Sequence, residues 1–224
     1  MSNDDWFRSN KWDKKAQELF ETKLKRSRGS FHKAQYLRIK ALALLDTKDK
    51  TKQKAGQILL ERLIKKYSTE TDQVMLAYEE LGQYYEQKKD LTKAEECYRK
   101  SVEVDTKRKS VYVTRSYFFL ARLLYELKEP HKIEEASELV EAIFSKNRSF
   151  PFYDENFELA ALMAKIAAEF GDIKVAVSMA KKALKFASFE ESQFSRHPEV
   201  GIVKSNSKVK KQLEEMKVII NKYE

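Results

Sequence analysis

The sequence predicts an all-helical protein built from helical hairpins, and three observations lead to this prediction. The chain has 224 residues but only five glycines and three prolines, so residues that break helices are scarce. Charged side chains make up 35% of it, and Lys, Glu, Leu and Ala are abundant. Apolar residues recur at spacings of three and four, which places them on one face of a helix. We therefore expect one compact domain or a short solenoid of helices joined by short turns.

The clearest unit runs from Met75 to Arg108 and has the pattern of two short helices folded back on each other. Its contact positions are Tyr78, Leu81, Gly82 and Tyr85 in the first helix and Ala94, Tyr98 and Ser101 in the second. Each set shares one helical face because its members are three, four or seven residues apart. Since glycine has no side chain, we expect the two backbones to approach closely at Gly82.

This unit resembles the tetratricopeptide repeat, a helical hairpin of about 34 residues with Leu-Gly, Tyr, Ala, an aromatic residue and a final Ala at these offsets. It departs from that pattern at Ser101, where the family usually has alanine, and at Thr106, where a proline often ends the unit. The resemblance implies a right-handed α-α superhelix, a solenoid of about four hairpins. It also implies a concave groove that binds proteins or peptides.

The N-terminal part of the chain predicts an arm and a leading helix. We expect Asn10 to cap a helix over Lys11–Arg26 and Gly29 to end it. The apolar face of this helix would consist of Trp12, Ala16, Leu19, Phe20 and Leu24. The arm precedes it and carries Trp6 and Phe7, which can pack either on the same chain or on a second one.

A degenerate hairpin over residues 31–67 comes next. Its first helix is expected over Phe31–Asp46, with Ser30 as the cap, and its second over Thr51–Lys66. The expected contact positions are Ala34, Leu37, Ala41 and Leu45 in the first helix and Ala55, Ile58, Leu59, Leu63 and Ile64 in the second.

Two more hairpins follow the clearest unit. The third has a helix over Ser110–Leu127, a turn at Glu129–His131 and a second helix. Its contact positions are Tyr117, Leu120, Ala121, Leu124, Ala136, Val140 and Ile143. The fourth joins Asp154–Phe170 to Ile173–Ala187, with Asp172 as the cap of its second helix. Its contact positions are nearly all alanine, which allows a close pair: Ala160, Met163, Ala164, Ala167, Ala176, Ala180 and Ala183.

A long loop leads to a final helix over Lys208–Tyr223. Val209, Leu213, Met216 and Ile220 share its apolar face, whereas Lys210, Lys211, Glu214, Glu215 and Lys217 are expected to point outward. Such a helix can cap the end of a solenoid. The predicted organisation is an arm and capping helix over residues 1–30, repeats over 31–188, and a loop and capping helix over 189–224.

The sequence offers no constellation typical of an enzyme, a cofactor site or a metal site. The histidines His32, His131 and His197 lie in separate units, and no glycine-rich phosphate motif occurs. The acidic pairs Glu79/Glu80 and Glu95/Glu96 are interpreted as solvated helix faces. Cys97 is the single cysteine, which leaves no disulfide and no standard zinc site. We expect a non-enzymatic protein with no cofactor and no metal.

The sequence also favours a bacterial, cytoplasmic protein that does not cross a membrane. It has no apolar signal-peptide core and no apolar run near the length of a membrane span. The segments DWFRSNKW, KLKRSR and YLRIKALAL resemble the start of bacterial repeat proteins of unassigned role.

A groove stripe is predicted on the third hairpin. Arg115, Phe118, Arg122 and Tyr125 are spaced i, i+3, i+7 and i+10, so they share one helical face. Two arginines with aromatic rings between them can bind a carboxylate while a ring packs against its apolar neighbour. The alternative is that Phe118 packs against the neighbouring hairpin and that the arginines pair with local glutamates. The resemblance adds Glu79 and Gln83 from the second hairpin and Lys165 from the fourth. The lining lacks the lysine and asparagine set of the carboxylate-clamp members of the family, so a receptor for chaperone tails is not supported.

Three function classes remain open at this level. The favoured one is a non-enzymatic adaptor that binds a protein or peptide segment in the groove. The alternative is an immunity-type inhibitor that blocks a cognate toxin enzyme through one tight complex. Nucleic-acid binding is the least favoured class: the net charge is +9, but the basic clusters are interleaved with acids and spread over several hairpins.

Overall fold

The computed structural model describes residues 5–108, 114–145 and 150–223. In these ranges the chain is all-helical, as the sequence predicts, with eleven helices and no strand. It divides into two compact units, Met1–Ser116 and Tyr117–Glu224, and each is described by itself. Of the helices in the described ranges, none combines the length and the apolar character needed to cross a lipid bilayer.

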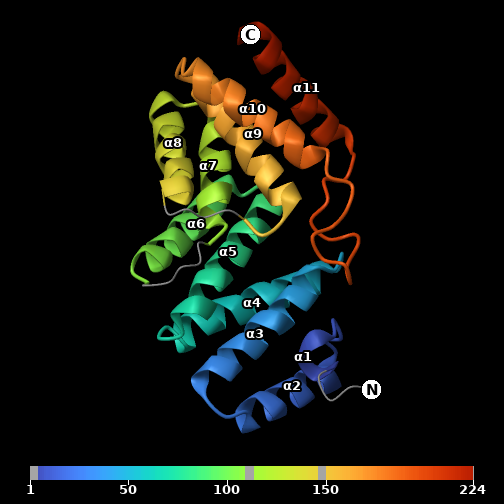
Figure 1. Ribbon diagram of the computed structural model, residues 1–224. Helices are drawn as coiled ribbons and strands as arrows, with labels where there is room; N and C mark the ends of the chain where they lie inside the picture. The colour runs from blue at the N-terminus through green and yellow to red at the C-terminus, as the bar shows by residue number, and fades with distance from the viewer. Residues whose placement is uncertain (1–4, 109–113, 146–149, 224) are drawn as a thin grey trace. The chain divides into compact units, whose positions relative to one another are not determined.

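The first unit contains six helices, and the second contains five, of which the first begins one residue before the boundary (Figure 1). Those of the first unit are α1 (Asp5–Arg8), α2 (Lys14–Arg26), α3 (Ser30–Leu45), α4 (Lys50–Lys66), α5 (Thr71–Gln87) and α6 (Leu91–Thr106). Those of the second are α7 (Ser116–Leu127), α8 (Pro130–Ser145), α9 (Tyr153–Glu169), α10 (Ile173–Ala187) and α11 (Ser207–Tyr223).

The hairpin of α5 and α6 confirms the close crossing expected at Gly82. A Cβ atom at this position would lie 2.4 Å from Cε1 of Tyr98, so the Tyr98 ring itself occupies the space that a side chain would need. Tyr98 is fully buried, and its hydroxyl donates to Glu86 at 2.8 Å. Ser101, which stands where the family has alanine, is buried and donates to the carbonyl of Met75 at 3.0 Å. Its hydroxyl is therefore satisfied, which explains how the departure is tolerated.

The helix ends near the N-terminus differ from the expected ones. α2 is capped by Asp13, whose side chain accepts from the backbone N–H of Ala16 at 2.9 Å, so Asn10 as the cap was wrong. α2 ends at Arg26, and Ser27 rather than Gly29 caps its C-terminal end. Gly29 instead precedes α3 in the position expected for Ser30, with φ of +74°. A positive φ favours glycine, so Gly29 serves the turn between the two helices.

The N-terminal arm packs on its own chain. The Trp6 ring lies 4.9 Å from the Tyr36 ring of α3 and 5.5 Å from the Phe20 ring of α2, measured between centroids. Lys40 of α3 is buried, and its Nζ donates to the backbone carbonyl of Ser9 at 2.7 Å. Burial lowers the pKa of Lys40 to about 8. In this structure the arm therefore packs in cis.

Two predicted core residues are exposed. Leu19 in α2 is 48% exposed and Ile58 in α4 is 50% exposed, so both predictions were wrong. Leu59 and Leu60, which follow Ile58 in α4, are both buried, and Phe20 and Leu24 form the buried face of α2. The neighbouring helices cover a narrower stripe than helical spacing alone allows.

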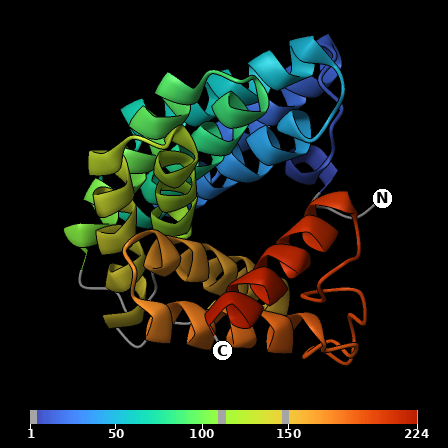
Figure 2. The same ribbon diagram turned by 90° about the horizontal axis from the view of Figure 1, so that it is seen from above.

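In the second unit, α9 and α10 form the alanine-lined hairpin that the sequence predicts. Ala160 and Ala164 of α9 and Ala180 and Ala183 of α10 are all buried in one cluster. Asp172 caps α10 by accepting from the N–H of Val175 at 3.1 Å. α11 lies against this hairpin (Figure 2). Its Met216 is fully buried in the same cluster. The expected capping role of α11 agrees with this packing.

The third hairpin is shorter than expected at its start. α7 begins at Ser116, and residues 110–113 of the expected helix lie outside the described residues. α8 begins at Pro130, where a proline is tolerated because its missing N–H would have no partner in the first turn. Tyr117, Leu120, Leu124, Ala136, Val140 and Ile143 are buried, as predicted.

Candidate protein-binding groove

A groove in the second unit is lined by α7, α9 and α11, and it contains four of the predicted binding residues. Phe118, Arg122 and Tyr125 come from α7 and Lys165 comes from α9. α11 adds Lys208, Lys211, Gln212 and Glu215. The cavity has a volume of about 170 Å³. A wider hollow of about 490 Å³ shares Tyr125, Lys165, Lys211 and Glu215 with it and extends along α11 to Tyr223.

The floor of the groove is aromatic. Phe118 is 3% exposed and Tyr125 is 9% exposed, so both side chains are part of the packed core of the unit as well as of the lining of the cavity. Phe118 packs against Phe150, with ring centroids 6.2 Å apart. The guanidinium carbon of Arg122 lies 5.9 Å from the Phe118 centroid and 5.6 Å from the Phe119 centroid. At these distances the rings attract the cation and orient its planar donor fork.

Tyr125, at the edge of the groove, forms a polar network with Lys128 and Glu169. The Tyr125 hydroxyl lies 3.2 Å from Oε1 of Glu169, and the ammonium of Lys128 donates to the same oxygen at 2.8 Å. The hydrogen bond from Lys128 holds the pKa of Glu169 below its ordinary value. Burial raises the pKa of Tyr125, so its hydroxyl stays protonated at neutral pH. This network fixes Tyr125 at the edge of the cavity.

The wall supplied by α11 was not predicted. Glu215 accepts from Lys165 of α9 at 3.4 Å, and Lys208 pairs with Glu158 of α9 at 3.5 Å. Glu215 was expected to point outward, and instead it is partly buried in the lining of the groove. Lys211 is exposed, as expected, and its side chain also borders the groove. Each of these ion pairs joins residues 50 positions apart in the sequence, a separation that no helical periodicity relates.

The other predicted groove residues lie elsewhere. Glu79 belongs to the first unit, is 7% exposed, and accepts from the hydroxyls of Thr114 and Ser116. Gln83, also in the first unit, lines a separate polar hollow with Glu80 and Tyr84. Arg115 directly precedes α7 and is half-buried. The structure therefore brings together Phe118, Arg122, Tyr125 and Lys165, whereas helical spacing from Arg115 does not apply because that residue is outside the helix.

Glu79 is buried and the Glu80 side chain is only 10% exposed, which corrects the interpretation of this pair as a solvated helix face. Oε1 of Glu80 lies 2.6 Å from the guanidinium of Arg38 on α3. Burial raises the pKa of Glu80 to about 7, and the neighbouring Arg38 opposes this shift. The tertiary contact with α3 supplies the partner that makes burial of a carboxylate possible.

The described residues show no reactive arrangement. Burial raises the pKa of Cys97 to about 12, so its thiol is protonated at neutral pH and is a poor nucleophile. His32, His131 and His197 are all exposed. Within the described ranges, no three His, Cys, Asp or Glu side chains are grouped so that they could hold a metal ion.

The comparison with known families concerns the hairpin of α5 and α6. Residues 77–108 match the sequence model of the tetratricopeptide repeat. The chain contains a tetratricopeptide repeat. This match covers the Gly82–Tyr98 crossing, and the all-helical packing of the chain is consistent with a tetratricopeptide-like helical repeat fold. No curated protein matches the chain. A tetratricopeptide repeat indicates a module for protein–protein interaction, and such repeats generally serve as non-enzymatic scaffolds.

Proposed function

We propose that this tetratricopeptide-repeat protein is a non-enzymatic module that binds a protein or peptide segment in the groove lined by α7, α9 and α11. The observation that carries the proposal is the position of Arg122 above the Phe118 and Phe119 rings, at the side of a cavity whose far wall is α11. Helices preformed in this way bind a segment with little reorganisation.

The chemistry of the groove fits a segment that carries a carboxylate next to an apolar side chain. The guanidinium of Arg122 can bind a carboxylate through two parallel hydrogen bonds. Phe118 and Tyr125 line the same cavity and offer apolar contact beside it. The lining has four basic side chains, Arg122, Lys165, Lys208 and Lys211, and three acidic ones, Glu126, Glu158 and Glu215. This small excess of positive charge favours an acidic ligand during encounter.

The test is affinity capture from the lysate of the source cell after nuclease treatment. The test variant is Arg122→Glu/Lys165→Glu, which reverses two charges in the groove. The matched control is Lys185→Glu/Lys210→Glu, which makes the same change in net charge at two exposed positions that do not line the groove. Arg115→Glu is measured separately because Arg115 lies outside α7.

We expect proteins retained by the wild type and by the control pair to be lost with Arg122→Glu/Lys165→Glu. Equal recovery of partners by the wild type, the control pair and Arg122→Glu/Lys165→Glu would refute binding in the groove. One tight partner with charge complementary to the groove would favour the immunity-type inhibitor over a general adaptor. Loss of every partner on nuclease treatment would favour nucleic-acid binding instead. A thermal melt of each variant shows whether it remains folded.

A further inference from the structure

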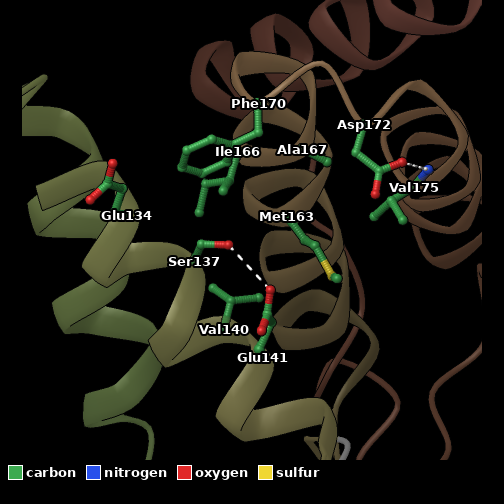
Figure 3. A pocket seen from close by; sticks show the side chains of 10 residues that line it. All are labelled: Glu134, Ser137, Val140, Glu141, Met163, Ile166, Ala167, Phe170, Asp172 and Val175. Carbon is green, nitrogen blue, oxygen red and sulfur yellow. Dashed lines mark hydrogen bonds between the residues drawn. The ribbon is translucent and has the colours of Figure 1, made fainter. Parts of the chain in front are cut away.

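A second pocket of the second unit lies among α8, α9 and the start of α10, and it shares no lining residue with the groove (Figure 3). Its volume is about 390 Å³. Nothing in the proposed function uses it. Its lining residues therefore have to indicate what kind of ligand it binds.

The walls of this pocket are apolar. α8 contributes Val140, and α9 contributes Met163, Ile166 and Phe170. Figure 3 shows the Phe170 ring extending from the end of α9 toward α8. Phe170 is 51% exposed, and the neighbouring Ile173 is 43% exposed. Two large apolar side chains at one helix turn are more than the isolated exposed residues that folded surfaces normally carry.

Apart from Ser137, the polar side chains that line the pocket are acidic. Glu134, Glu141 and Asp172 line it, and no lysine or arginine does. Among the described residues, no basic side chain forms an ion pair with Glu134 or Glu141. Glu141 accepts only weakly from Ser137, at 3.5 Å, and Asp172 uses one oxygen to cap α10. On a chain with a net charge of +9, this is a local concentration of negative charge.

We propose that this pocket binds a partner segment that places an apolar side chain in the cavity and a lysine or arginine beside it. The apolar side chain would bury its surface against Met163, Ile166 and Phe170. The basic side chain would lay its aliphatic stem along Phe170 and direct its charge to Glu134 and Glu141. The preference for a basic segment is the opposite of that of the α7–α9–α11 groove, so the two sites select different ligands.

The ligand test uses three peptides and methyl NMR of the full chain. The probe is Gly-Lys-Leu-Phe-Arg-Gly, and its controls are Gly-Glu-Leu-Phe-Glu-Gly and Gly-Lys-Ser-Ser-Arg-Gly. With the methionine methyl groups labelled, Met163 reports the pocket, whereas Met75 and Met216 lie elsewhere and serve as references. We expect only the probe to shift the Met163 signal in a saturable way at concentrations up to about 1 mM.

The residue test uses a pair of matched double variants. Glu134→Lys/Glu141→Lys removes the negative charge of the pocket. Glu138→Lys/Glu190→Lys makes the same change in net charge at two exposed positions outside the lining. We expect the first to weaken binding of the probe at least about tenfold and the second to change it by less than about threefold. Phe170→Ser should also weaken it.

Three results would overturn the proposal. The first is a Met163 signal that no peptide shifts. The second is equal weakening by the two double variants, which would make the binding a general effect of net charge. The third is an unchanged affinity of the Phe170→Ser variant for the probe, which would show that the apolar contact with Phe170 does not contribute to binding. Arg122→Glu, in contrast, should leave the Met163 titration unchanged, so failure here is distinguishable from failure of the groove.

Discussion

Gly82 and Tyr98 set the separation of the two helices in the tetratricopeptide repeat. Because the Tyr98 ring occupies the site of a Cβ atom at position 82, any side chain there must displace a buried ring. We predict that Gly82→Leu lowers the free energy of unfolding by about 1–3 kcal/mol, the usual range for overpacking. Urea denaturation followed by circular dichroism measures it. The double variant Gly82→Leu/Tyr98→Ala should lose less than the sum of the two single losses, since both act on one contact.

Glu80 is the residue whose burial makes stability depend on pH. Its pKa is about 7 in the folded chain, against an ordinary value of 4.5. Between these values the folded state keeps a proton that the unfolded state releases, so the folded state binds more protons. The free energy of unfolding therefore falls as pH rises from about 4.5 to about 7, by on the order of 3 kcal/mol.

The variant Glu80→Gln isolates this effect because glutamine does not titrate. The difference in the free energy of unfolding between wild type and Glu80→Gln should fall through the same pH window and be constant above it. Urea denaturation at half-unit pH steps measures both curves. A difference that rises with pH would mean that the ion pair with Arg38 outweighs the cost of burial.

The last helix, α11, packs against the final hairpin of the chain and also lines the groove. It is anchored by Met216, which is fully buried against α9 and α10, and it supplies one wall of the groove. We predict that Met216→Ala costs about 2–4 kcal/mol, because it leaves a cavity in the alanine-lined cluster. Hydrogen exchange should show faster exchange in α11 than in the wild type.

Val218 provides the control on the same helix. It is 62% exposed, so Val218→Ala should change the free energy of unfolding by less than about 0.5 kcal/mol. Equal losses for the two variants would mean that α11 is held by its helix propensity rather than by the Met216 contact. Weaker ligand binding with Met216→Ala but not with Val218→Ala would link the anchoring of α11 to the groove.

The molecule as a whole has a net charge of +9, and positive charge attracts nucleic acid. Many of its basic side chains already pair with acids, as in Arg62–Glu21 and Arg38–Glu80. We predict weak, unspecific binding to a labelled 20-nucleotide RNA that disappears by about 150 mM salt. Fluorescence anisotropy at several salt concentrations measures it. Tight binding that survives this salt and is abolished by Arg122→Glu would contradict the protein-binding proposal.

Several predictions about the whole chain stay predictions. They are the three-part division at residues 30 and 188, a cytoplasmic location and a bacterial source. The structure divides the chain into Met1–Ser116 and Tyr117–Glu224 on the basis of internal contacts. The predicted three-part division follows the repeats and their capping helices instead, so the two divisions are not comparable.

The tetratricopeptide hairpin and the approximate positions and order of α2 to α11 could be predicted from the sequence, whereas α1 and several helix ends could not. The predictable features depend on residues three to seven positions apart, such as Leu81 and Tyr85 or Ala160 and Ala164, and helical periodicity encodes such spacings directly. The cap at Asp172 was equally predictable, because a cap contacts the N–H three residues ahead in its own segment.

Which polar residues are buried and which helices line a common cavity depends on the packing of the helices in the tertiary structure. Arg38 reaches Glu80 across 42 positions, and Lys165 reaches Glu215 across 50. The acidic pocket of α8, α9 and α10 and the α11 wall of the groove arise in the same way. Contacts of this kind depend on how whole helices pack, and local spacing in the sequence carries no record of that packing.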